Sequence, residues 1–124
     1  MSERQETDLP LAIEEWGWKF HHLGIPTKNV APDEKYLPDL KFSTQGFKDN
    51  PFGVEWMRFD EDCRLPEIIK TQPHLAFVVD DLEFELSSRG FNVIVEPNAP
   101  SDSVRVAMIE YNGAPIELME IGMK

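Results

Sequence analysis

The chain has 124 residues, 41% of them hydrophobic, which is enough for one domain with a buried core. Its formal net charge of −11, with lysines and arginines scattered along the chain, argues against binding to nucleic acid or to an anionic membrane surface. One cysteine excludes an intrachain disulfide, and no stretch resembles a signal peptide or a membrane span, so we expect a cytoplasmic protein.

The N-terminal region is predicted to contain an arm over residues 1–14, followed by a strand. Hydrophobic and polar residues alternate over 16–25, which is typical of a strand with two different faces. On this alternation His22 lies on the same face as Phe20, whereas His21 lies on the opposite face.

The remainder of the first half is predicted to hold one short helix and two strands. Residues 31–38 begin with Ala-Pro-Asp-Glu and contain a closing proline, a pattern typical of a short helix. Strands are expected over 40–44 and 52–59, separated by glycine, asparagine and proline residues that favour turns. The acidic, proline-containing segment 61–72 then connects the two halves of the chain.

The second half is predicted to have the order β-α-β-β-β. Its helix covers 82–89, begins after Asp80 or Asp81 as the N-cap and ends at Gly90. Strands are expected over 74–79, 91–96, 104–111 and 115–121, with a loop over 97–102 and a hairpin turn at Asn112-Gly113. The first half follows the same order as a trimmed copy, with a shorter helix and one strand fewer.

Each half contains one histidine and one glutamate in equivalent positions. The first strands share a motif, His-Leu-Gly-Ile over 22–25 and His-Leu-Ala-Phe over 74–77, and each half ends in an apolar strand that carries one acid. A carboxylate among apolar neighbours is costly to bury unless it is paired or binds a metal. The repeat therefore predicts a four-ligand metal site composed of His22, Glu55, His74 and Glu117.

Each of these residues also has a structural interpretation. A lone histidine in a strand is more often a hydrogen-bonded core or surface residue, and Glu117 is also compatible with an edge strand that faces water. His21 competes with His22 as the ligand. The duplication of the pattern and the alternation of the first strand favour His22 and the set given above.

These motifs, in this order, resemble the vicinal oxygen chelate superfamily, which includes glyoxalase I, extradiol dioxygenases, methylmalonyl-CoA epimerase and the bleomycin- and fosfomycin-resistance proteins. The resemblance covers residues 16–122 and is strongest over 74–120. It implies an α+β fold in which two paired βαβββ modules form a curved mixed sheet around a cleft, the first module being trimmed. The glyoxalase-like domain would span 15–122, with module 1 at about 16–60 and module 2 at about 73–122.

The resemblance also implies a function. Members of the superfamily hold a divalent metal in the cleft, here Zn, Ni, Fe, Mn or Co. A small substrate with two adjacent oxygens would chelate this metal, which stabilises an enolate or oxyanion while a glutamate moves the proton. Glu117 is the first choice for this base and Glu55 the second. The expected function is therefore that of a metal-dependent lyase or isomerase of the glyoxalase-like type.

Two other functions are compatible with the sequence. A resistance-type protein would bind a small molecule or drug without chemistry, and the acidic charge would suit a cationic ligand. An extradiol-type dioxygenase would bind Fe(II) through His22, His74 and Glu117 alone and would leave Glu55 free. Because modules pair across a dimer in many members of the superfamily, a homodimer is expected.

Overall fold

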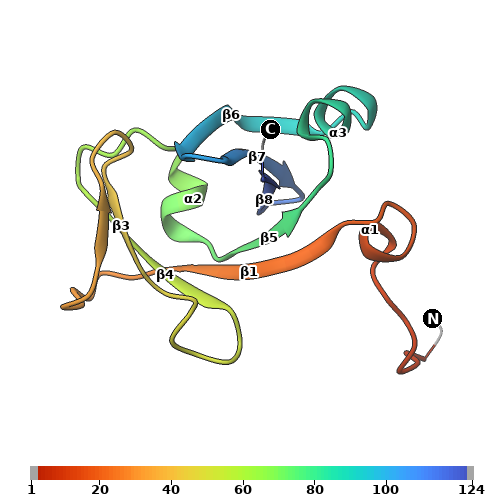
Figure 1. The fold of residues 1–124 in the computed structure, drawn as a ribbon, viewed down its shortest axis with the longest axis horizontal. Helices are drawn as coiled ribbons and strands as arrows, with labels where there is room; N and C mark the ends of the chain where they lie inside the picture. The colour runs from red at the N-terminus through yellow and green to blue at the C-terminus, as the bar shows by residue number, and fades with distance from the viewer. Residues whose placement is uncertain (1–2, 123–124) are drawn as a thin grey trace.

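Eight strands form one curved mixed sheet in the computed structural model, which describes residues 3–122 (Figure 1). The strands are β1 (Lys19–Pro26), β2 (Lys35–Leu37), β3 (Phe42–Gly46), β4 (Val54–Phe59), β5 (His74–Val78), β6 (Asn92–Ser101), β7 (Val104–Tyr111) and β8 (Ala114–Ile121). The helices are α1 (Leu11–Glu14), α2 (Glu67–Thr71) and α3 (Leu82–Ser88). The order across the sheet is β2-β3-β4-β1-β5-β8-β7-β6, and the predicted α+β class is confirmed.

The sheet consists of two halves with the same internal pairing. In the first half β1 runs parallel to β4, and β4 is antiparallel to β3. In the second half β5 runs parallel to β8, and β8 is antiparallel to β7. The equivalent first strands, β1 and β5, pair antiparallel at the centre and join the halves. The predicted pairing of two modules is thus confirmed.

The first module contains four strands, and the short helix predicted over 31–38 is wrong. Residues Lys35–Leu37 instead form β2, which pairs antiparallel with β3. The segment lies between Pro32 and Pro38, and so few residues cannot form a stable isolated helix. The prediction that this module has one strand fewer than the second module is also wrong. This module is trimmed in another way, because the described part of the chain has no helix between β1 and β2.

The second module follows the prediction, apart from one loop. The side chain of Asp81 accepts a hydrogen bond from the backbone N–H of Phe84 at 3.0 Å, which confirms Asp81 as the N-cap of α3. Asn112 and Gly113 have φ angles of 50° and 84°, as the predicted tight hairpin between β7 and β8 requires. The predicted loop over 97–102 is wrong, because β6 extends into it with register shifts against β7. Prolines are tolerated there because β6 is an edge strand.

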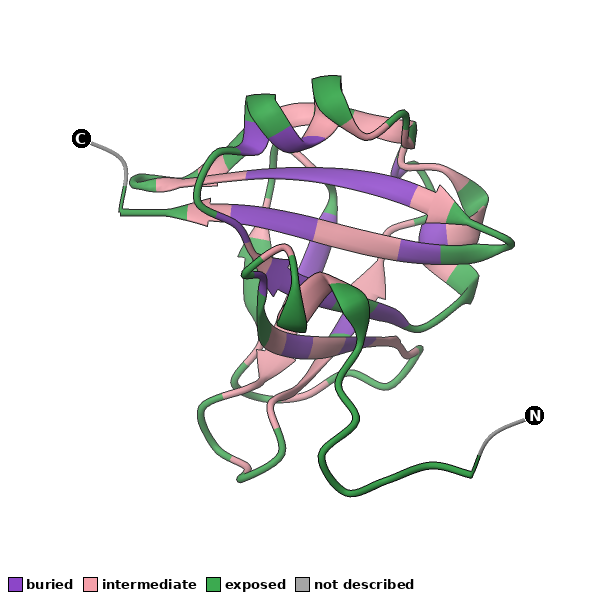
Figure 2. Ribbon diagram, turned by 90° about the vertical axis from the view of Figure 1, so that its right-hand side faces the viewer, coloured by how far each residue is buried: buried purple, intermediate pink, exposed green. Residues whose placement is uncertain are grey.

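The two faces of the sheet have different surroundings. On the outer face, α1 and α3 contribute to a core whose buried members are Trp18, Phe77, Val79, Leu82, Ala107, Ile109 and Leu118. Figure 2 shows this burial as the purple stretches of the strands beneath α3. On the inner face a smaller cluster is formed by Ala76, Val106 and Met119. The inner face carries the candidate site.

Two helices lie outside the two modules. α1 falls within the predicted N-terminal arm, and its Ala12 and Ile13 pack against the outer core. α2 falls within the predicted connector, and its Ile69 is buried. The division into an arm over 1–14, a connector and two modules stays a prediction. None of the helices among the described residues is long and apolar enough to cross a membrane.

Candidate metal centre

The two predicted histidine ligands lie on the central strands β1 and β5, with ring centroids 5.8 Å apart. In this antiparallel pair His22 is opposite Ala76 and His74 is opposite Gly24, so each imidazole faces a small residue on the neighbouring strand. The space is needed, because a Cβ on Gly24 would lie 2.2 Å from Cε1 of His74. Both histidines are buried, with only 4% and 2% of their surface exposed.

The two glutamates occupy equivalent positions on the strands that flank this pair. Glu55 on β4 is level with Gly24, and Glu117 on β8 is level with Ala76. In each module the glutamate is therefore opposite the residue that follows the module's own histidine by two positions on the neighbouring strand. Since side chains two residues apart point to the same face of a sheet, this shared register brings the four predicted ligands to one face.

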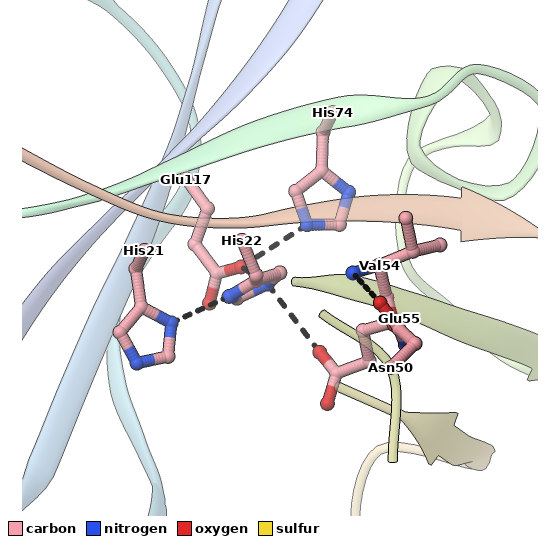
Figure 3. Close-up of polar contacts among 7 residues, drawn as sticks. All are labelled: His21, His22, Asn50, Val54, Glu55, His74 and Glu117. Carbon is pink, nitrogen blue, oxygen red and sulfur yellow. Dashed lines mark hydrogen bonds and ion pairs between the residues drawn. The ribbon is translucent and has the colours of Figure 1, made fainter. Parts of the chain in front are cut away.

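The four side chains meet in one cluster (Figure 3). Nε2 of His22 lies 3.3 Å from Oε1 of Glu55 and 3.4 Å from Oε1 of Glu117. Nε2 of His74 lies 3.1 Å from the same Glu117 oxygen. The ligand atoms of His22, His74 and Glu117 all lie within 4.8 Å of one another, whereas Glu55 joins them through His22. All four residues belong to one chain, so they come together without a partner.

An extra residue in β1 changes the face to which His21 belongs. Phe20 and His22 pair with consecutive residues of β5, so His21 is the additional residue of a β-bulge. His21 therefore lines the same cavity as His22, and its predicted placement on the opposite face is wrong. The predicted placement of His22 with Phe20 is wrong for the same reason, since the Phe20 ring packs edge-on against Phe77 of the outer core.

Asn50 fixes the turn that leads into β4 and so positions Glu55. Its side-chain Oδ1 accepts hydrogen bonds from the backbone N–H groups of Phe52, at 3.0 Å, and Val54, at 3.2 Å. Its Nδ2 donates to the carbonyl of Val54 at 3.0 Å (Figure 3). The residue pattern of this segment predicts only a turn. The signal for its role is an asparagine placed before a strand, where its side chain can bond to the following backbone.

The carboxylate of Glu117 is held in its ionised form. Burial by itself would raise the pKa of Glu117, but hydrogen bonds from His22 and His74 outweigh burial and lower the pKa to about 2. Burial likewise opposes the charged form of His22, but its hydrogen bond to Glu117 and the negative charges of both glutamates raise its pKa. The cluster therefore favours the presence of positive charge, whether a proton or a metal ion.

Glu55 has a different environment from Glu117. Burial raises the pKa of Glu55, against a smaller opposing effect of the nearby His22. Its side chain is 27% exposed, compared with 15% for Glu117. Of the two acids, Glu55 is thus the more accessible and the more readily protonated.

The residues of the cluster fit a divalent metal. Ligand atoms that lie 2.0–2.2 Å from a metal at right angles to one another are roughly 3 Å apart. The nitrogen-to-oxygen separations in the cluster are 3.1 to 3.4 Å. Imidazole nitrogens with carboxylate oxygens suit Zn, Ni, Fe, Mn or Co. Over residues 3–122, no second group of three metal-ligating side chains comes this close together.

Two cavities adjoin the cluster, and Glu117 lines both of them. The larger, of about 230 Å³, is lined by His22, Glu55 and Glu117 together with Lys35. The smaller, of about 80 Å³, is in contact with His74 and Glu117. Its other walls are mainly apolar and include Leu40, Phe42, Met57, Leu65, Ile69 and Met108. The larger cavity thus offers charged groups among apolar ones next to the cluster, whereas the smaller cavity is mainly apolar.

A cavity of about 590 Å³ lies away from the cluster, at the ends of β1 and β4, and none of the four predicted ligands lines it. Two of the positive groups in its wall, Arg58 and Lys70, already have partners. Arg58 forms a two-pronged ion pair with Glu34, and Lys70 donates to the backbone carbonyl of Cys63. Because this cavity offers no comparable set of converging side chains, the cluster is the better candidate site.

The paired modules around this cluster have the glyoxalase-like fold that the sequence predicts. No protein-family model matches the sequence, and no curated protein matches it either. Solved structures supply the comparison instead.

Methylmalonyl-CoA epimerase from Mycobacterium tuberculosis is similar over 85% of this chain and 89% of its own, with a TM-score of 0.61 and 19% sequence identity. A hypothetical protein from Bacillus halodurans is similar over 86% of this chain and 96% of its own, with a TM-score of 0.64 and 17% identity. At these identities the likeness establishes the fold alone.

Proposed function

We propose that this chain is a small metal-dependent enzyme that moves a proton on a substrate with two adjacent oxygens, as lyases and isomerases of the glyoxalase-like type do. The observation that carries the proposal is the convergence of two buried imidazoles on one ionised carboxylate, with Nε2 of His74 3.1 Å from Oε1 of Glu117. The likeness to a methylmalonyl-CoA epimerase supports an isomerase within this range of reactions.

In this proposal His22, His74 and Glu117 hold the metal, and Glu55 lies beside it. When bound, a divalent metal supplies a Lewis acid for the substrate oxygens and stabilises the enolate or oxyanion. The low pKa of Glu117 supports its role as a ligand, because a carboxylate that is already ionised need not lose a proton before it binds a cation.

We assign the proton transfer to Glu55. A general base works best when its pKa lies near the working pH, and burial raises the pKa of Glu55, whereas that of Glu117 is about 2. Glu55 also lines the larger cavity beside the cluster. This assignment reverses the order in which the sequence ranks the two acids, and it leaves Glu117 as a ligand.

The adjoining cavities favour a small substrate. A volume of about 230 Å³ on one side and about 80 Å³ on the other leaves room for few non-hydrogen atoms. The apolar walls of the smaller cavity suit a short aliphatic group, and Lys35 in the larger cavity suits an anionic group. Hydroxyketones, hemithioacetals and short branched thioesters or acids are therefore the substrates to try first.

Metal content and proton exchange test the proposal. Wild type, His74→Ala and Glu55→Gln are reconstituted with Zn, Ni, Mn or Fe and analysed by inductively coupled plasma mass spectrometry. We expect about one divalent ion per chain in the wild type and in Glu55→Gln, and none in His74→Ala. Exchange of a substrate proton with deuterium from the solvent, followed by NMR, should be slower in Glu55→Gln by a factor on the order of 10²–10⁴.

Two outcomes would contradict the proposal. A wild-type protein that binds no divalent metal would leave a non-catalytic role, which a thermal-shift screen with cationic small molecules would examine. Metal that stays bound in His74→Ala would lie elsewhere in the chain. The expected homodimer also stays a prediction, and sedimentation velocity measures it directly.

The extradiol-type dioxygenase is the second candidate function, because the three ligand atoms within 4.8 Å of one another belong to His22, His74 and Glu117. Two histidines and one carboxylate are the ligand set of many Fe(II) oxygenases. Oxygen uptake by the Fe(II)-loaded protein with catechols would favour this candidate, especially if Glu55→Gln retained the activity. Proton exchange that is supported equally by Zn and abolished in Glu55→Gln would exclude it.

A further inference from the structure

We propose that His21 is a positioning residue for His22: it accepts a hydrogen bond from Nδ1–H of His22 and thereby keeps the Nε2 lone pair of His22 directed at the metal centre. This inference rests on the proposed function for its purpose, but the hydrogen bond itself exists without a metal. Three independent features of the chain support it.

The first feature is the β-bulge in β1. A regular strand would place neighbouring residues on opposite faces, and His21 would then lie far from the imidazole of His22. The additional residue in the pairing with β5 removes this constraint and brings both side chains to the cavity of about 230 Å³. Bulges commonly redirect a side chain beside a functional site.

The second feature is the contact between the two rings. Nδ1 of His21 lies 2.7 Å from Nδ1 of His22, which is a full hydrogen-bond distance (Figure 3). Two ring nitrogens this close share one proton, so one of them donates and the other accepts. If Nε2 of His22 binds a metal, its lone pair is used there and the proton of His22 must lie on Nδ1. His21 is then the acceptor, and the tautomers of the two rings are coupled.

The third feature is the stacking of Phe47 on His21. The two rings are nearly parallel, with an interplanar angle of 13° and centroids 4.8 Å apart. Phe47 adopts a φ of 67°, which is unusual for a bulky residue, and its backbone N–H donates to the carbonyl of Val54 at 2.7 Å. The strained turn is therefore tied to β4, next to Glu55, and it holds the His21 ring in place.

The second histidine of the cluster provides a contrast. Nδ1 of His74 is buried and has no hydrogen-bond partner among the described residues. The orientation of His74 depends on the packing of its ring against Gly24 and on its contact with Glu117. Of the two histidines of the cluster, His22 is thus the one whose Nδ1 has a hydrogen-bond partner among the described residues. His22 is also the histidine that contacts both glutamates.

Two substitutions of His21 separate hydrogen bonding from packing. His21→Phe keeps an aromatic ring for Phe47 but removes the acceptor, whereas His21→Asn supplies an amide oxygen near the position of Nδ1. We expect His21→Phe to lower the affinity for Zn, measured by competition with a chelator, by about 10–100-fold. We expect His21→Asn to recover most of this loss. Thermal unfolding of the metal-free proteins checks that both variants are folded.

Nitrogen NMR of histidine-labelled protein provides a readout that needs no metal. In the metal-free wild type, the Nδ1 signals of His21 and His22 should show one shared hydrogen bond, and this signature should disappear in His21→Phe and return in part in His21→Asn. With Zn bound, His22 should be protonated only on Nδ1.

Equal Zn affinity and unchanged His22 signals in His21→Phe would overturn the inference. Complete loss of metal in both variants, as in His74→Ala, would also overturn it, because His21 would then be a ligand. If the wild type binds no Zn, the proposed function fails, while the NMR comparison still decides whether His21 orients His22.

Discussion

The two modules place their ligands alike but surround them differently. In both modules, the glutamate is on the parallel neighbouring strand, opposite the residue that follows the histidine by two positions. Yet Glu117 accepts hydrogen bonds from both histidines, whereas Glu55 is in contact with His22 alone, and their pKa values move in opposite directions. The repeat determines where the four groups lie, and the different neighbours of each glutamate determine its pKa and its exposure.

The outer faces of the modules differ as well. In the second module α3 covers the sheet, and the buried core lies beneath it. The first module has no equivalent helix in the described part of the chain, and large side chains on its outer face are exposed, such as Phe20 at 48% and Trp56 at 38%. The buried outer core therefore lies mainly in the second module, and the first module has the more accessible acid of the site.

The largest expected effect compares two phenylalanines that face each other across the centre of the sheet. Phe77 is buried in the outer core, and Phe20 on the paired strand is half-exposed, with ring centroids 6.4 Å apart. Phe77→Ala should lower the free energy of unfolding by about 3–5 kcal/mol, whereas Phe20→Ala should cost about 1 kcal/mol. Urea denaturation followed by tryptophan fluorescence measures both. Equal losses in the two variants would show that the outer face of the first module is covered in solution.

The next effect is the pH dependence of stability in the metal-free protein, to which the two glutamates contribute with opposite signs. The pKa of Glu117 falls from 4.5 to about 2 on folding, which corresponds to roughly 3 kcal/mol. A lowered pKa in the folded state stabilises the fold above the unfolded value, so this contribution is fully present above about pH 4.5 and is lost as the pH falls towards 2.

His22 acts in the opposite direction. Its pKa is raised above 6.5 on folding, so its contribution is full below pH 6.5 and is lost as the pH rises through the folded value. The contributions of Glu117 and His22 are therefore both full between about pH 4.5 and 6.5, whereas the raised pKa of Glu55 lowers the stability as the pH rises above 4.5. Unfolding free energies of wild type and Glu117→Gln across this range provide the measurement. A Glu117→Gln variant with the same acid dependence as the wild type would contradict the assignment.

The repeated elements of this chain could be predicted from sequence because each rests on a local rule. The β-α-β-β-β order of the second half follows from alternation, an aspartate N-cap and an Asn-Gly turn. The predicted glyoxalase-like fold is confirmed, and the four predicted ligands, His22, Glu55, His74 and Glu117, lie in one cluster. Their roles in metal binding and catalysis stay predictions.

The irregular elements could not be predicted in the same way. A β-bulge is defined by two strands together, so alternation within β1 alone places His21 on the wrong face. β2 has only three residues, and it exists because β3 offers a pairing edge and Arg58 binds Glu34 beside it. The opposite electrostatics of the two glutamates likewise depend on contacts across the sheet rather than on their neighbours in sequence.

The smallest expected effect concerns the small residues opposite the histidines. A Cβ on Gly24 would lie 2.2 Å from Cε1 of His74, whose side chain is 1% exposed, so Gly24→Ala must displace the ring. We expect a loss of about 1–3 kcal/mol in stability together with weaker metal binding. The mirror change, Ala76→Gly opposite His22, removes atoms and should cost about 1 kcal/mol with metal affinity retained. Isothermal titration and urea denaturation measure both quantities, and a Gly24→Ala variant that binds metal normally would show that the His74 ring is free to move aside.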